Sequence, residues 1–527
     1  MKKLIQVSLL VLVPQLLLGW LIYTYQNMGR ESSLQELSNE YTSAQRTRID
    51  HTRFTELQRH FETPQEITEA CLSCHYERGE EMLNNHHFTW ERPEFMPERG
   101  VVYTGKKTAI NNWCTSVLTS EQTCKRCHAG YGWETYSFEY DYQNPNNIDC
   151  LVCHDNSFTY SRRRGNVEHP DFIAQLPEFE AVLKNLSSPR RENCGICHFM
   201  GGGGNNVKHG DLELALLNAD KAMDVHMARE GVDLSCVDCH IAENHNIRGR
   251  YYGIATTNTN RVSCSDCHGR FPHTDNLINE HCIKVSCQTC HIPEYAKENP
   301  TVMHWDWRTM GRLDPDGKPF EIEDEMGNIV YQSIKGSFEW KSNLAPSYVW
   351  FNGTAQQHLM TDTISETPVM MNRLFGAYRD PLAQIVPVKI NTGYQLYDPI
   401  YRTLLHMKLY DHEEGKGAFW KDFNTRKAIE KGMDYIGMPF SGEYDFIETK
   451  NHMLVNHMVA PKEEALTCTD CHVREQGRLN DLRDFYMPGR DSHAGIVRYG
   501  RALFILSLAA IAIHIVARVI ITLKKTT

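Results

Sequence analysis

The sequence has no excess of basic residues. Its 527 residues include 55 Lys and Arg against 66 Asp and Glu, which gives a net charge of −11 at pH 7. Nucleic-acid binding needs a basic surface, so this balance argues against a nucleic-acid partner. Spare cysteine is also scarce, because only Cys114 and Cys282 of the 18 cysteines lie outside a repeated spacing. Glycine (34) and proline (21) occur at ordinary levels and exclude no class of fold.

The repeated spacing is Cys-x-x-Cys-His, and it occurs eight times. One such unit could be a redox dithiol or half of a zinc site, but eight units that all end in His indicate covalent haem attachment. Two thiols then hold each haem and the histidine ligates its iron. The units are Cys71-Cys74-His75, Cys124-Cys127-His128, Cys150-Cys153-His154, Cys194-Cys197-His198, Cys236-Cys239-His240, Cys264-Cys267-His268, Cys287-Cys290-His291 and Cys468-Cys471-His472.

Eight haems can form a shared core with little regular secondary structure. We therefore expect a mainly α-helical multihaem cytochrome c fold with much irregular structure, packed around eight covalent c-type haems. Such haems are attached outside the cytoplasm, which predicts a periplasmic location. The segment between Ile292 and Thr467 has no motif. It has strand-like pieces and one helical pattern near Trp420–Met433, and we expect it to cover the haems and supply ligands.

Both ends of the sequence carry apolar runs. Residues 1–30 contain a run from Leu4 to Tyr23 that could be a signal peptide or an anchor; its end lacks the small residues of a cleavage site, which favours an uncleaved anchor. Residues 499–527 contain a second run followed by two lysines, which predicts a C-terminal transmembrane helix. We expect a stalk at 31–70 and an octahaem catalytic domain at 71–495, on the inner membrane, with the haem domain in the periplasm and both termini in the cytoplasm.

Iron in an electron-relay haem normally takes a second histidine, and 18 of the 26 histidines lie outside the motifs. Histidines in polar flanks, such as His51, His60 and His493, are expected to be ordinary surface residues. His86, His281, His304 and His452 are possible substitutes for the favoured distal ligands. The favoured ligands are His87, His209, His226, His245, His273, His358 and His457.

An enzyme of this type needs one iron that the protein leaves open to substrate. The stretch Cys194–Asp211 suggests where, because four glycines (201–204) precede the adjacent potential ligands Lys208 and His209. A lysine must lose its proton to bind iron, and at pH 7 this costs about 4.6 kcal/mol, which a buried ferric centre can supply. Cys114 is a second candidate, since a free thiol in an oxidising compartment is a liability; it could also pair with Cys282.

Several segments resemble the octahaem tetrathionate reductase family of c-type cytochromes, and the resemblance covers roughly Ala70 to Arg490. All eight motifs follow the order of that family. The segments that carry the resemblance are HFTWERP (87–93), GKKTAINNWC (105–114), CHAGYGW (127–133), NPNNIDCLVCHD (144–155), GGGGNNVKHGDLE (201–213), CQTCHIP (287–293), SIKGSFEW (333–340), WFNGTAQQHL (350–359) and NHMVAPKEEALTC (456–468).

The resemblance implies that the second motif carries the active-site haem. Lys208 would ligate its iron, His128 would anchor locally without ligating, Cys114 would line the pocket, and the other seven haems would be bis-histidine relays. The sequence departs from the family in having Asn205 three residues before the lysine, where an acidic residue is usual. An amide can form hydrogen bonds but cannot deliver a proton.

These observations predict a membrane-anchored octahaem reductase that acts on a small anionic substrate, with tetrathionate reduction to thiosulfate as the activity that the resemblance implies. Nitrite or hydroxylamine reduction is one alternative. A non-catalytic electron conduit is another. A cytochrome b or another quinol-linked membrane protein is the expected electron donor.

Overall fold

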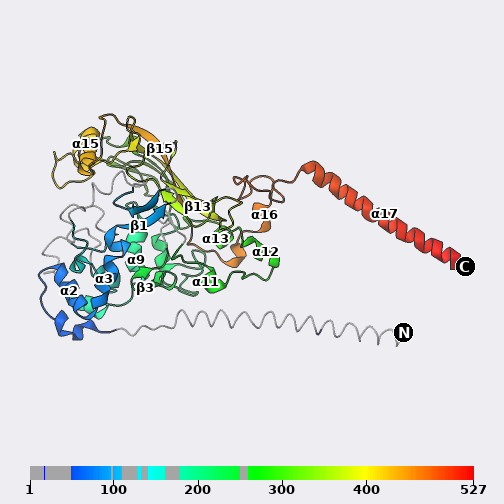
Figure 1. Cartoon of the computed structure of the whole chain (residues 1–527), viewed down its shortest axis with the longest axis horizontal. Helices are drawn as coiled ribbons and strands as arrows, with labels where there is room; N and C mark the ends of the chain where they lie inside the picture. The colour runs from blue at the N-terminus through cyan, green and yellow to red at the C-terminus, as the bar shows by residue number, and fades with distance from the viewer. Residues whose placement is uncertain are drawn as a thin grey trace.

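The computed structural model describes residues 17, 49–96, 99–109, 127–131, 140–160, 179–249 and 259–526. They form one body, from which the last helix, α17, extends outward (Figure 1). The part of the body that carries the first seven motifs lies on one side, and a β-sheet with strands β13 and β15 lies on the other. The predicted N-terminal anchor lies outside the described residues except for Leu17.

The motif-bearing part is built from short helices, two β-hairpins and long irregular connections. Most of these helices span a few residues, because each motif forms little more than one helical turn. The elements are η1 (His51–Arg53), η2 (Thr55–Leu57), α2 (Pro64–Cys74), α3 (Tyr76–Leu83), α4 (His86–Thr89), β1 (Glu91–Met96), β2 (Gly100–Gly105), η5 (Pro145–Asn147), α6 (Leu151–His154), α8 (Phe179–Lys184), α9 (Arg191–His198), η7 (Leu214–Asn218), α10 (Cys236–Cys239), β3 (Ala242–Glu243), β4 (Asn246–Ile247), α11 (Ser265–His268), α12 (Asn276–His281) and α13 (Cys287–His291).

Residues 49–70, directly before the first motif, belong to this body, whereas a stalk was expected at 31–70; residues 31–48 lie outside the described residues. Leu57, Phe61 and Ile67 are buried in a cluster with Leu151 and Val182. Helix α2 starts at Pro64 behind Thr63, whose hydroxyl accepts a hydrogen bond from the Glu66 amide at 3.4 Å. Proline in the first turn and a threonine cap are typical helix starts. The segment from η1 onward therefore holds the first motif against the third.

The segment that lacks motifs forms a nine-stranded sheet, which the expectation of a mainly helical fold did not include. Strand order is β11-β15-β13-β5-β8-β7-β6, with β9 and β14 also paired to β13. The strands are β5 (Thr301–Asp306), β6 (Glu321–Glu323), β7 (Ile329–Gln332), β8 (Gly336–Lys341), β9 (Ser347–Phe351), β11 (Val369–Met370), β13 (Gln384–Asp398), β14 (Thr403–Leu404) and β15 (Asp445–Leu454), and the hairpin of β10 (Ala355–Gln357) and β12 (Asn372–Leu374) lies beside it.

This sheet has a hydrophobic core of its own. Trp305 and Trp307 are each 1% exposed and stack with ring centres 5.1 Å apart. Helices α14 (Phe419–Asp422) and α15 (Thr425–Tyr435) cover them and bury Phe419 and Met433 in the same cluster. The single helix predicted near Trp420–Met433 is thus present as two helices, because the chain turns at Phe423, which has φ +47°. The chain then passes through η9 (Lys462–Glu464) and returns to the motif-bearing part at α16 (Cys468–Cys471).

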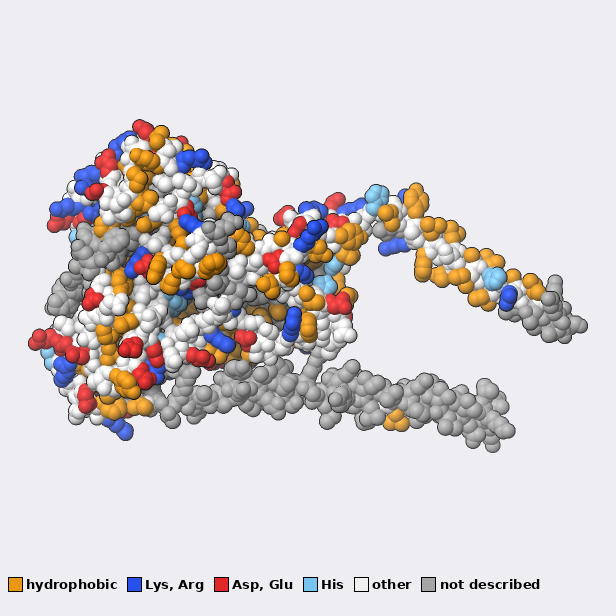
Figure 2. All heavy atoms as spheres, viewed as in Figure 1, with side chains coloured by type: hydrophobic (Ala, Val, Ile, Leu, Met, Phe, Trp, Pro, Cys, Tyr) orange, Lys and Arg blue, Asp and Glu red, His pale blue; other side chains and the backbone are white. Residues whose placement is uncertain are grey.

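Helix α17 (Ala494–Thr526) follows the last motif and is exposed from Arg498 to Arg518. Its segment Arg498–Arg518 has a mean hydropathy of 2.0 and is long and apolar enough to cross a membrane. Apolar side chains surround it on the visible face, in contrast to the mixed charges of the body (Figure 2). A surface of this kind is unusual for a helix in water.

Candidate haem sites

The motifs whose residues are described lie on tight helical turns. In three of them an acidic residue inside the motif caps its own helix. Its carboxylate accepts a hydrogen bond from the backbone amide before the first cysteine, in a capping-box arrangement. These pairs are Ser235 with Asp238 at 2.7 Å, Ser263 with Asp266 at 3.2 Å and Thr467 with Asp470 at 2.6 Å. The pattern is readable in the sequence, and it fixes the turn that presents both cysteines on one side.

A second histidine faces the motif histidine at six of the motifs. The separations between ring centres fall in a narrow range. They are 6.3 Å for His198 and His87, 6.3 Å for His154 and His245, 6.3 Å for His240 and His457, 5.9 Å for His268 and His226, 6.1 Å for His291 and His273, and 6.1 Å for His472 and His281.

This separation fits one metal ion between each pair. Two imidazoles bonded through nitrogen to opposite sides of one ion, with bonds of ~2.0 Å, have ring centres ~6 Å apart. Throughout the described part of the chain, no group of three or more His, Cys, Asp or Glu could hold a metal ion. Each pair could therefore supply two protein ligands to a haem iron, and the porphyrin would supply the remaining ones.

The hydrogen bonds of the paired rings leave their Nε2 atoms available. His154, His240 and His472 use Nδ1 with backbone carbonyls at 3.0, 2.9 and 2.8 Å. Metal-ligating histidines commonly donate the other ring N–H to a carbonyl or carboxylate in this way. Burial lowers the pKa of His87 and His198 to about 3, so both are neutral, which is the form that binds iron.

Five of the favoured distal ligands lie in these pairs: His87, His226, His245, His273 and His457. The other two, His209 and His358, are in none of these six pairs.

His281 faces His472 instead, and His51 lies next to His75, whose pKa is lowered by burial and then by His51. The structure thus brings His281, named above as a possible substitute, and His51, expected to be an ordinary surface residue, close to motif histidines. His281 shares a helix face with Leu277 one turn earlier, a periodicity that could have favoured it. No local pattern marks His51, because the fold alone brings residue 51 to residue 75.

Contacts between cysteines of different motifs give the order in which the sites follow one another. The Cys71 and Cys150 thiols are within hydrogen-bond reach, as are Cys194 with Cys236 and Cys264 with Cys287. Electrostatic neighbours complete the series: Cys153 with Cys194, Cys239 with Cys267 and Cys290 with Cys471. The sites therefore form a continuous row that runs through His75, His154, His198, His240, His268, His291 and His472.

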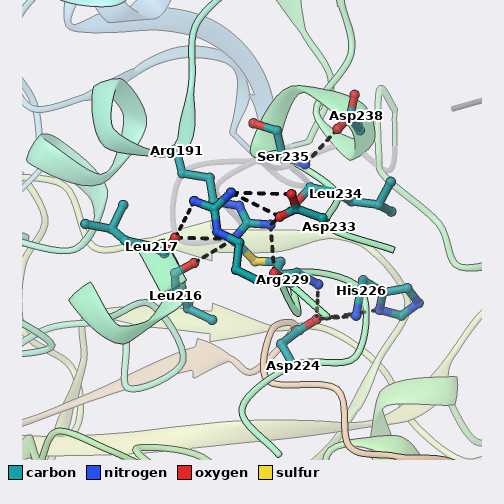
Figure 3. Close-up of polar contacts among 11 residues, drawn as sticks. Arg191, Leu216, Leu217, Asp224, His226, Arg229, Asp233, Leu234, Ser235 and Asp238 are labelled. Carbon is teal, nitrogen blue, oxygen red and sulfur yellow. Dashed lines mark hydrogen bonds and ion pairs between the residues drawn. The ribbon is translucent and has the colours of Figure 1, made fainter. Parts of the chain in front are cut away.

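Arg191 stabilises the middle of this row through a set of hydrogen bonds (Figure 3). It lies one turn before Cys194 in α9 and is 3% exposed. Its guanidinium donates to Asp233 at 2.9 Å and to the backbone carbonyls of Leu216, Leu217, Met227 and Leu234. The loop held in this way carries His226 and leads into α10, so one side chain positions parts of three neighbouring sites.

His128 of the second motif differs from the other motif histidines. Its Nε2 atom is in hydrogen-bond contact with the carbonyl oxygen of Phe88, and the ring is 1% exposed. Trp90 and Tyr140 surround it, with ring centres 4.8 and 6.2 Å away. A methyl group at Gly130 would lie 2.8 Å from the His128 ring, so glycine is needed there. Nε2 is the ring nitrogen that the other motif histidines leave available for iron. In His128 this atom points at a backbone carbonyl instead.

Two lysines lie next to the aromatic residues around His128. The Lys106 amine is 5.7 Å from the centre of the Trp90 ring. The Lys107 amine is 3.7 Å from the centre of the Tyr142 ring and bonds Glu91 at 3.1 Å. Because the Glu91 carboxylate offsets the charge of Lys107, Lys106 is the amine here that would attract a small anion.

The glycine loop turns the chain back so that Lys208 lies against Gly201. Gly202 has φ +84°, and a side chain there would meet Val207 at 2.8 Å. His209 is an electrostatic neighbour of both Lys208 and His198, and burial lowers its pKa well below the ordinary value. Lys208 and His128 therefore both lie next to the His87–His198 pair. Lys208 is connected to this pair through its neighbour His209. His128 is connected to it through Phe88, the residue after His87.

A second lysine, Lys389 of β13, holds this loop on the sheet. It is fully buried, and its amine donates to the carbonyls of Val207 and Lys208 at 3.2 and 3.0 Å and to the Thr301 hydroxyl at 2.5 Å. Thr301 in turn bonds the Asn206 carbonyl at 2.5 Å. Sequence reasoning missed Lys389 because nothing nearby in the sequence marks it.

The remaining candidates are more distant from this contact network. Asn205 uses its amide oxygen to accept from the Leu214 amide at 2.9 Å, so it shapes the turn before η7. His358 follows β10 and is an electrostatic neighbour of Asp362 and Arg99. Cys114 and Cys124 lie outside the described residues.

Comparisons with known proteins agree with this geometry. Residues 302–475 match the family model described as "Cytochrome c bacterial". The fold is similar to the crystal structure of the octahaem cytochrome c from Shewanella oneidensis, with a TM-score of 0.71 and 37% sequence identity. That match covers 80% of this chain and 94% of the other. None of the curated proteins matches the chain.

Proposed function

Because the chain belongs to the family of multihaem c-type cytochromes that includes this octahaem protein, we propose that it is a membrane-anchored periplasmic octahaem reductase. Its reaction centre would lie at the second motif, with Lys208 as the protein ligand of the iron. The observation that carries the proposal is the position of His128, whose Nε2 meets the Phe88 carbonyl instead of being available. A site of this kind needs a ligand from elsewhere and leaves one side for substrate.

A c-type haem supplies a redox-active iron when bound, and the chain's residues set what happens around it. The histidine pairs hold their sites in fixed positions for electron relay. Lys106 would raise the local concentration of anions near the second motif. Lys389 keeps the Lys208 backbone fixed, so that its amine reaches iron from a prearranged loop.

We propose tetrathionate as the substrate. Its reduction breaks the central sulfur–sulfur bond with two electrons, gives two thiosulfate ions and consumes no proton. Asn205 suits such a reaction, because its amide is committed to the Leu214 N–H and carries no acidic proton. Nitrite and hydroxylamine reduction consume several protons. These reactions are the alternative if an acid elsewhere in the site supplies them.

We also propose that α17 is a membrane anchor. The exposed apolar segment Arg498–Arg518 and the lysines that follow it support a cytoplasmic C-terminus and a periplasmic haem domain. The donor would then be a quinol-linked membrane protein such as a cytochrome b. A truncation before Ala494 should move the protein from the membrane fraction to the soluble one, while a C-terminal tag on the full chain should be accessible only from the cytoplasm.

Electron paramagnetic resonance of the fully oxidised protein tests the reaction centre. We expect one haem signal that responds to tetrathionate, and the response to nitrite and hydroxylamine would compare the two substrate classes. Signals that are low-spin and indifferent to all three compounds would instead support a conduit without catalysis. Steady-state reduction of tetrathionate with a reduced viologen as donor provides the activity measurement.

A further inference from the structure

The histidine pairs differ in what accepts the hydrogen bond from the distal ring. His457 bonds the Asp211 carboxylate at 3.1 Å, and His245 bonds the Glu81 carboxylate at 2.7 Å. His87 bonds the neutral amide oxygen of Asn85 at 3.0 Å. A carboxylate makes a ligating imidazole more basic and so stabilises the oxidised metal, whereas a neutral acceptor does so less. The His87 site should therefore hold an electron more strongly than the other two.

The orientation of the Asn85 amide is fixed by its second contact. Its nitrogen donates to the backbone carbonyl of His245, so its oxygen must face the His87 ring. The same side chain therefore touches the distal ligands of two adjacent sites. Asn85 is buried, at 7% exposure, which increases its effect on the local potential. An aspartate could not make both contacts.

Charged side chains near the row also make the His87–His198 site easier to reduce than the two sites that flank it. Lys106 is an electrostatic neighbour of both His87 and His198. A positive charge favours the added electron of a reduced site. Lys106 is exposed, so solvent screens its field and its contribution is smaller than that of Asn85. At the flanking sites the Asp211 and Glu81 carboxylates oppose reduction, although Arg78 shares the charge of Glu81.

The order of the sites along the row indicates what these differences in reduction potential do. The cysteine contacts put the His87–His198 site between the His154–His245 and His240–His457 sites. Phe88 follows His87 and contacts His128 of the second motif. We infer that Asn85 and Lys106 make the His87–His198 site the electron store of the row, flanked by weaker acceptors and adjacent to the reaction centre. The inference rests on the proposed function only for the use of the stored electron.

The store would serve a reaction that takes two electrons in close succession. The site would accept one electron from a neighbouring site of the row and pass one electron on when substrate is bound. A second electron then follows from the row to refill it. Because the store is a property of reduction potentials, it can be measured without any substrate.

The test is a spectroelectrochemical titration of the full-length holoprotein and its variants. In the native protein, the component with the most positive potential should correspond to one haem. Asn85→Asp should shift that component to lower potential, and Lys106→Gln should shift it in the same direction by less. Lys421→Gln removes an equal charge from the exposed surface of α14 and should leave every component unchanged. Asp211→Asn should raise a different component.

Asn85→Asp also loses the contact with the His245 carbonyl and could fail to fold. Lys106 contacts neither histidine ring. If Asn85→Asp does not fold, the reduction potentials of Lys106→Gln alone decide whether the inference holds. The inference is overturned if the most positive component stays in place in Lys106→Gln and in any folded Asn85→Asp protein with full haem content. Tetrathionate turnover does not enter this readout, so an inactive protein with the expected shifts would reject the proposed substrate and keep the store.

Discussion

The motif-bearing part and the sheet are held together in different ways. Helices α10 and α16 have four residues each and could not persist alone, because isolated helices of this length are unstable in water. The sheet instead buries Trp305, Trp307 and Phe419 in a core of its own side chains. The comparison indicates that covalent haems would supplement the smaller side-chain clusters of the first part. The loop of Lys208 lies where the two parts meet.

The largest expected effect comes from removing the lysine at this junction. Lys208→Ala should lower tetrathionate turnover by on the order of 10²-fold or more, the loss seen when a prearranged group of a reaction centre is removed. The measurement is steady-state activity at matched haem content. Lys421→Ala on the exposed surface of α14 is the control and should keep full activity. Unchanged turnover in Lys208→Ala would reject the assigned ligand.

Removing the hydrogen bonds of Arg191, which stabilise the motif-bearing part, should greatly lower the free energy of unfolding. Arg191→Leu leaves buried carbonyls and Asp233 without their donor, and should lower the free energy of unfolding by about 3–5 kcal/mol. Denaturant titration followed by circular dichroism measures it. The neighbouring Arg190 is exposed, so Arg190→Leu should stay within about 0.5 kcal/mol of the native value. Equal effects of the two variants would show that the Arg191 contacts do not stabilise the row.

Removing the buried lysine by which the sheet holds the Lys208 loop should lower both stability and activity. Lys389→Met leaves the carbonyls of Val207 and Lys208 without a donor, which costs about 1–3 kcal/mol for each buried group. Turnover should fall about 10–100-fold, as when a group that orients a ligand is lost. Lys341→Met, on an exposed position of β8, is the matched control. Full activity with lowered stability would limit Lys389 to a structural role.

The smallest expected effect concerns one helical turn within the row. Asp238→Ala removes the carboxylate that caps α10 and should lower the free energy of unfolding by about 1 kcal/mol. Glu243→Ala, at an exposed position of β3, should change it far less. If both variants behave alike, the haem attached to the motif holds the turn without help from its cap.

Local sequence pattern predicted those features that depend on neighbours along the chain. The Cys-x-x-Cys-His spacing fixed the motif turns, and the helix expected near Trp420–Met433 is present as two helices. The sheet was missed because its strands pair across long separations, such as β5 with β13, and the pattern of short runs does not show such pairing. The row order was also hidden, since it depends on which motifs pack together.

The sequence by itself determined the chemistry: which cysteines and histidines are available for haem, the positions of the motifs, and the apolar run of α17. These follow from residue type and spacing, which are local properties. Only the tertiary structure decided which histidine faces which motif, that His281 faces His472 and His51 lies near His75, and that Lys389 holds the loop of Lys208. Those contacts join residues far apart in the chain, and only the packing of the whole body brings them together.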